Sequence, residues 1–232
     1  METPIWKLMI RIALPGILVI TTGCASTSDK LPPVSEEGLK RVENTRVDAL
    51  YVDPQADFSE FKRFAIADVD VSFRRNWLRD QNQTRTQPSR RVSQQDANSI
   101  RAAVADSFKL IFTEELEKAG YTVVDPAAAE NGPGDLLLLH PDILDLDVTA
   151  PDIASPGLTR TYTACGCSMT LSLELFDAMS GSLLARITDR KKAPDQRPMR
   201  ITNSVTNKAD ADRIMRRWAK MLVDKLASVH GT

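Results

Sequence analysis

The chain has 232 residues, of which 42% are hydrophobic, and it contains three cysteines and two histidines. Its formal net charge of −1 excludes the strongly basic class of nucleic-acid-binding proteins, so no nucleic-acid partner is expected. The hydrophobic content excludes an intrinsically disordered chain, and the length suits one globular domain with a sizeable core.

The N-terminal segment has the three parts of a secretory signal. Lys7 and Arg11 supply charge, Ile12–Ile20 is an apolar run, and small residues precede Cys24. The residues Thr21–Cys24 resemble the bacterial lipobox, in which a branched apolar residue and two small residues direct a diacylglycerol to the cysteine thiol. We therefore expect a lipoprotein signal peptide over residues 1–23 and lipidation at Cys24.

The N-terminal sequence leaves two alternatives to a lipoprotein. Thr21 stands where the lipobox usually has Leu, so ordinary cleavage after Ala25 would give a soluble periplasmic protein. An uncleaved membrane anchor is disfavoured, because spanning needs roughly 20 apolar residues and the run Ile12–Ile20 is far shorter. Ala25 replaces the Asp that typically retains lipoproteins in the inner membrane, so we expect the periplasmic face of the outer membrane.

A polar segment follows the cysteine and separates it from the predicted domain. It is rich in Ser, Thr, Lys, Glu and Pro, the composition of a solvated linker. We predict a flexible tether over residues 24–49 and a single α/β domain over residues 50–232.

The first half of this domain alternates strands with one helix. A strand is predicted over Phe64–Phe73, with its apolar face on Ala65, Ala67, Val69, Val71 and Phe73. A helix should begin after Ser93, an N-cap with Asp96 three residues on, and end at Gly120. A short strand, Tyr121–Asp125, should follow.

The second half predicts three more strands and a long helix. Pro141 should interrupt the strand that begins at Leu136, after which Leu144, Leu146 and Val148 alternate with Asp145 and Asp147. The segment Met169–Leu175 and the segment Leu183–Arg190 form a hairpin through Ser180–Gly181. An amphipathic helix is expected over Ala209–Val229.

This order of elements predicts a mixed α/β (α+β) fold. We expect a two-layer sandwich, with a mixed, mostly antiparallel sheet of about five strands and two helices on one face.

Three segments resemble a known family. These are Tyr51–Phe58 (YVDPQADF), Phe73–Trp77 (FRRNW) and Leu175–Arg186 (LFDAMSGSLLAR). Together with the lipobox and the C-terminal helix, they are similar to the bacterial lipoproteins grouped as domain of unknown function 3313. The resemblance implies the cell envelope, and it implies no activity.

The motif Cys165-Gly166-Cys167 has three interpretations. Thiolates suit soft metals such as Cu(I), but the sequence lacks the further Cys and His ligands of a closed metal site. In a strand, the two Cα atoms would lie near the upper limit for a disulfide. A local disulfide between Cys165 and Cys167 is favoured, two unpaired thiols remain the alternative, and no metal site is assigned.

The arginine-rich segment from residue 74 to residue 91 is the candidate for partner binding. Phe73 and Trp77 offer apolar anchors, while Arg74, Arg75 and Arg79 can bind carboxylates or phosphates. An envelope protein or anionic lipid head groups would be suitable partners. The alternative is an ordinary solvated loop.

No catalytic residue can be named, because the sequence lacks a nucleophile elbow, an HExxH motif and a phosphate-binding loop. We expect no enzyme and no cofactor. The sequence favours a lipid-anchored interaction or structural module of the envelope, and a small-ligand or metal-binding protein is the second hypothesis.

Overall fold

The structure is a computed structural model that describes residues 31–83, 85, 87–127, 134–150, 161–163, 167–193, 200–202 and 204–230. From Pro32 onward these residues form one compact unit. Its strands are β1 (Lys40–Arg41), β2 (Ala49–Val52), β3 (Arg63–Ile66), β4 (Asp70–Phe73), β5 (Thr122–Val124), β6 (Leu136–Val148), β7 (Thr161–Thr163), β8 (Cys167–Asp177), β9 (Leu183–Lys192) and β10 (Arg200–Thr202). Its helices are α1 (Trp77–Asn82), α2 (Gln94–Lys118) and α3 (Ser204–His230), with short 3-10 turns η1 (Phe58–Glu60) and η2 (Pro88–Arg90).

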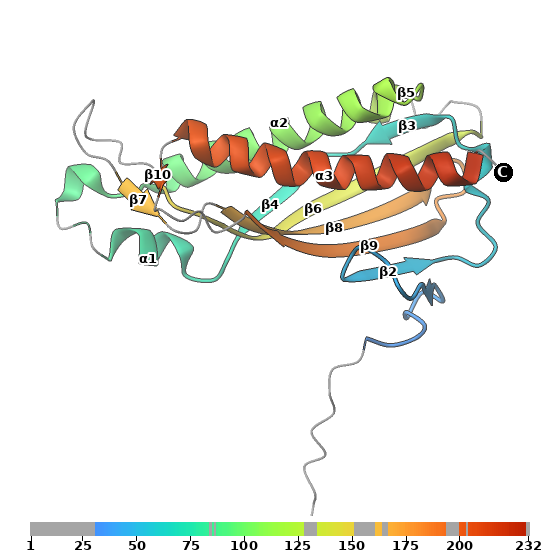
Figure 1. Cartoon of the computed structure of the whole chain (residues 1–232), viewed down its shortest axis with the longest axis horizontal. Helices are drawn as coiled ribbons and strands as arrows, with labels where there is room; N and C mark the ends of the chain where they lie inside the picture. The colour runs from blue at the N-terminus through green and yellow to red at the C-terminus, as the bar shows by residue number, and fades with distance from the viewer. Residues whose placement is uncertain are drawn as a thin grey trace, which may run out of the picture. The chain divides into compact units, whose positions relative to one another are not determined.

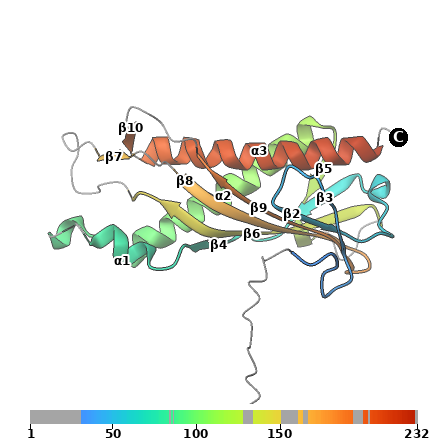
Figure 2. The ribbon, with the colours of Figure 1, turned by 60° about the horizontal axis from the view of Figure 1, so that its bottom comes forward.

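One large mixed sheet organises the domain. Within the described residues it has eight strands in the order β1-β2-β9-β8-β6-β3-β5, and β4 pairs with β6 beyond the end of β3. Strands β3, β4 and β5 run parallel to their neighbours, and the other pairs are antiparallel. Helices α2 and α3 lie side by side over one face of the sheet (Figures 1 and 2). The mixed α+β class is confirmed, but the sheet is larger than the expected five strands and α1 was not predicted.

The bounds of helix α2 follow from its capping residues and from apolar residues at helical spacing. Ser93 and Asp96 form a capping box, in which each side chain accepts a hydrogen bond from the other's backbone N–H. On the buried face, Phe108 and Phe112 stack with ring centroids 3.9 Å apart. Because local signals and burial agree, the predicted helix is confirmed.

The strand predicted over residues 64–73 is two strands. The chain leaves the sheet between β3 and β4, although the Ala67 N–H still donates to the Leu139 carbonyl. In β3 Phe64 and Ile66 are buried in the main core, so the predicted apolar face on Ala65 and Ala67 is wrong for this strand. The reason is that Phe64 and Ile66, which share one face of β3, point to the main core, whereas Ala65 between them does not belong to that core.

Strand β6 continues through Pro141, which was expected to interrupt it. The Leu139 carbonyl points toward the β3 side of β6, where it accepts from the Ala67 N–H. Pro141, two residues on, has its backbone nitrogen on the same side, so its missing N–H lies opposite the break between β3 and β4. A proline is tolerated there because no neighbouring strand needs its donor.

A β-bulge then reverses the predicted side alternation of β6. Its register shifts by one residue between Leu144 and Asp147, and Asp145 has a left-handed backbone with φ of 51°. As a result Leu144 is 40% exposed, while Leu146 is fully buried. The prediction that these two leucines share a face is wrong because the extra residue turns the strand over.

Part of the predicted tether is folded. Leu39 is only 2% exposed and packs with Ala49 and Tyr51, and the Tyr51 hydroxyl donates to the Pro32 carbonyl at 2.9 Å. We call residues 32–41 the N-terminal strap. The ordered unit therefore begins at residue 32 instead of residue 50, because a few apolar side chains hold this polar segment on the sheet.

Candidate ligand groove

A groove lies between the second half of α3 and the strands β2, β9 and β8. Its volume is about 620 Å³, which falls inside the range of roughly 300 to 1,000 Å³ found for small-molecule sites. Strand alternation builds its floor, since every second side chain of β8 and β9 faces the helix layer. The floor residues are Leu171, Leu173, Leu175, Ala185 and Ile187.

The walls of the groove come from distant parts of the sequence. Trp218, Leu222 and Leu226 of α3 follow helical spacing and form one wall. Leu50 and Val52 of β2 form the other, because they pair with Ile187 and Ala185 and share their face. The floor and the two walls are therefore mostly aliphatic, with Trp218 as an aromatic member.

Polar side chains gather at the groove's rim. The loop from Val42 to Val47, which joins β1 to β2, contributes Arg46, and α3 contributes Asp224 and Lys225. All three charged residues are exposed, and within the described part of the chain none of them has an ion pair. The rim therefore carries two cations and one acid that are available to a ligand.

A buried acid fixes α3 beside the groove. Asp189 of β9 is completely buried and accepts a hydrogen bond from the Trp218 indole N–H at 2.6 Å. Lys191 Nζ lies 2.7 Å from its other oxygen, and the Asp48 N–H donates to that same oxygen. These donors offset the cost of burying the carboxylate and tie α3 and the start of β2 to β9.

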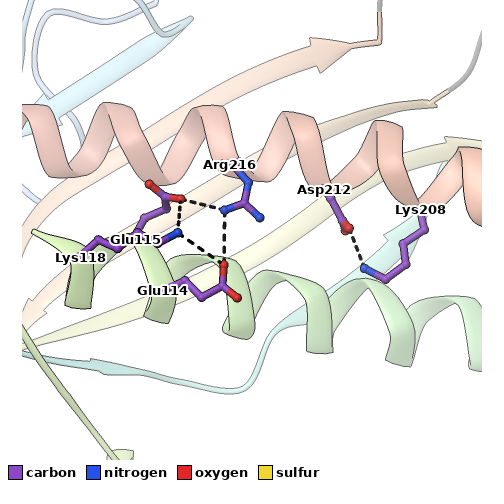
Figure 3. Close-up of polar contacts among 6 residues, drawn as sticks. All are labelled: Glu114, Glu115, Lys118, Lys208, Asp212 and Arg216. Atoms are coloured by element: carbon purple, nitrogen blue, oxygen red, sulfur yellow. Dashed lines mark hydrogen bonds and ion pairs between the residues drawn. The ribbon is translucent and has the colours of Figure 1, made fainter.

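An ionic cluster clamps α3 to α2 on the side away from the groove. Arg216 of α3 contacts Glu115 at 2.8 Å and Glu114 at 3.4 Å, and Lys118 completes the cluster (Figure 3). Because α3 is held by α2 on one side and by Asp189 below, its last turns can border an open space without collapsing onto β2.

The structure places the predicted partner-binding residues at the end of β4 and in α1. Trp77 is only 1% exposed, stacks on Phe73 with ring centroids 3.8 Å apart, and donates to the Val148 carbonyl. Arg74 bridges Asp80 and Asp147, which raises its pKa. Trp77 is thus a core residue.

Arg75 and Arg79 are the members of that set that remain exposed. Arg79 lies 3.2 Å from Asp80 but keeps most of its side chain in solvent. Partner binding by this segment stays a prediction, and it now depends on these two arginines.

The predicted cysteine sites fall largely outside the described residues. Cys24 and Cys165 lie outside them, and Cys167 is a buried residue at the start of β8 whose carbonyl accepts from the Ala193 N–H. The disulfide and the lipidation therefore stay predictions. Among the residues that the structure does describe, no three His, Cys, Asp or Glu side chains gather as metal ligands.

The groove was not predicted from the sequence. Its lining carries no motif, and the loop with Arg46 fell inside the predicted tether. The run Ala49–Val52 was a usable signal, because four consecutive apolar residues indicate a short strand before the first predicted strand.

The family model for proteins of unknown function DUF3313 matches residues 32–222. The chain belongs to this family. The match begins where the N-terminal strap begins, so the strap is part of the family's domain. No match to a curated protein is found.

Two solved structures illustrate what the fold is similar to. The PelC dodecamer from Paraburkholderia phytofirmans has 9% identity and a TM-score of 0.39, covering 72% of this chain and 93% of that one. A minor lipoprotein from Acinetobacter baumannii has 9% identity and a TM-score of 0.33, covering 72% and 92%. Superpositions this loose carry no argument about function.

Proposed function

We propose that this DUF3313 protein is a lipid-anchored binding module of the cell envelope, and that its groove takes an apolar ligand. The groove itself carries this proposal, because its floor side chains are buried with the main core and still line a space of about 620 Å³ beside α3. The lipobox at Thr21–Cys24 supports the envelope address, and Ala25 supports the outer membrane.

Binding is favoured over catalysis by the groove's chemistry. Its titratable side chains are Arg46, Asp224 and Lys225 at the rim, and its lining offers no pair of nucleophile and base. We therefore propose a binding role without a cofactor. We also propose a second contact, in which the exposed Arg75 and Arg79 bind an acidic envelope protein or anionic head groups.

The test is binding of an uncharged apolar fluorescent probe to the mature chain. Ile187→Trp should fill the groove from its floor and abolish most of the probe's fluorescence increase. Ser172→Trp is the matched control, because it places the same ring on the opposite face of the neighbouring strand. If both variants bind the probe like the wild type, the groove is not the binding site and the proposal fails.

A further inference from the structure

We infer that the groove's ligand is a single-chain fatty acid, with its acyl chain on the aliphatic floor and its carboxylate at the rim. This inference rests on the proposed function and names the ligand class for the same site. It is carried by two observations, the mostly aliphatic lining of the groove and two cations at its mouth that form no ion pair with any residue the structure describes.

The lining selects for a methylene chain. The floor consists of leucines, an alanine and an isoleucine, with the aromatic rings of Phe58 and Trp218 at its borders. None of these floor side chains offers a hydrogen-bond donor or acceptor, so a polar ring or sugar would lose its hydration without compensation. Each additional methylene buried there should strengthen binding roughly fourfold.

The rim selects for an anionic end group. Arg46 and Lys225 reach the groove from two different elements, the β1–β2 loop and α3, and neither forms an ion pair with an acid among the described residues. Asp224 is the acid at the same rim, so the local balance is one net positive charge. A carboxylate can pair with either cation while its chain points inward, whereas a cationic end group would have Asp224 as its one partner and two like charges beside it.

The experiment is calorimetric titration of the mature chain with three probes of equal chain length. Dodecanoate should bind one to one, dodecanol more weakly, and dodecyltrimethylammonium most weakly. Tetradecanoate should bind more tightly than dodecanoate, because it buries two more methylenes.

Variants that each remove one charge at the rim test which residues bind the carboxylate. Arg46→Gln and Lys225→Gln should each weaken dodecanoate binding about fivefold, the effect of losing one exposed ion pair, and leave dodecanol binding unchanged. Lys220→Gln is the matched control, because Lys220 lies on α3 but does not line the groove. Asp224→Asn should strengthen dodecanoate binding.

The outcomes separate the two proposals. If dodecanol or the ammonium probe binds as tightly as dodecanoate, or if the Arg46 and Lys225 variants bind it unchanged, the fatty-acid inference is overturned while an apolar groove stands. If no probe binds, or if binding survives Ile187→Trp, the proposed function itself fails.

Discussion

Asp189 and Trp218 form the polar contact on which the position of α3 depends. The carboxylate is completely buried, and the indole N–H is one of the three donors that compensate for its lost hydration. Trp77 makes a similar indole bond, but to the neutral Val148 carbonyl. The two tryptophans therefore provide a matched comparison of a charged and an uncharged buried acceptor.

Trp218→Phe should lower the free energy of unfolding more than Trp77→Phe does. Each change removes an indole donor, but a hydrogen bond to a charged group contributes about 1.5 to 3 kcal/mol against about 1 kcal/mol for a neutral one. Urea unfolding followed by circular dichroism measures both values. Equal losses would mean that the Asp189 carboxylate does not depend on Trp218.

Glu37 holds the N-terminal strap through Arg186. The guanidinium donates to both carboxylate oxygens, at 2.7 and 3.1 Å, and this lowers the pKa of Glu37 from 4.5 to about 2. A carboxyl with a lowered pKa stabilises the folded state above its unfolded pKa, and the contribution is lost as the pH falls through the folded value.

The stability that this contact contributes should therefore be complete above about pH 4.5 and should decline as the pH falls, until half of the Glu37 carboxyl groups are protonated at about pH 2. Titration of the Glu37 carboxyl carbon by NMR measures this directly. Arg186→Gln should move the Glu37 pKa back toward 4.5, and an unchanged low pKa in that variant would contradict the assignment to Arg186.

At the scale of elements, the bulge in β6 decides which side chains reach the core. Asp145 adopts a left-handed conformation there, with φ of 51°. A residue with a Cβ pays roughly 1 to 2 kcal/mol for this conformation, and Asp and Gly tolerate it best.

Asp145→Gly should leave stability within about 0.5 kcal/mol of the wild type, whereas Asp145→Val should lower it by about 1 to 2 kcal/mol. Chemical denaturation of both variants measures the difference. If Val is tolerated as well as Gly, the bulge is not held in the left-handed conformation and the burial of Leu146 needs another cause.

Helices and strands were predicted correctly where capping or apolar periodicity within a segment agrees with the side chains that the structure buries. Helix α2 has a capping box, a clean apolar spacing and a glycine after its end, so it was predicted from Ser93 to Gly120 and is confirmed. The β8–β9 hairpin was also predicted, since Met169, Leu171, Leu173 and Leu175 alternate without interruption. The predicted side alternation of β6 was wrong, because a bulge inserts one residue into the strand and the sequence gives no other sign of it.

At the scale of the whole molecule, the folded strap shortens the link to the proposed anchor. Eight peptide steps separate Cys24 from Pro32, so this link can span at most about 29 Å when fully extended. The predicted tether to residue 49 would have allowed a much longer reach. None of the helices in the described residues is long and apolar enough to cross a membrane.

Intact-mass spectrometry on protein purified from membranes tests the anchor. The mature chain should begin at Cys24 and carry two or three acyl chains, and Cys24→Ala should abolish both the cleavage and the added mass. An unacylated chain beginning at Ser26 would show a soluble periplasmic protein and would remove the anchor from the proposal.

Periodicity and capping within short segments were enough to predict the α+β class, the long helices and the late hairpin, and three short sequence segments carried the family resemblance. The bulge at Asp145, the folded strap and the groove depend on contacts between segments that are distant in the sequence. The groove combines residues 42–52, 171–187 and 218–229. Periodicity shows that each of these segments has an apolar face, but the position of α3, set by Asp189 and the α2 ion pairs, determines that these faces do not fully close on one another.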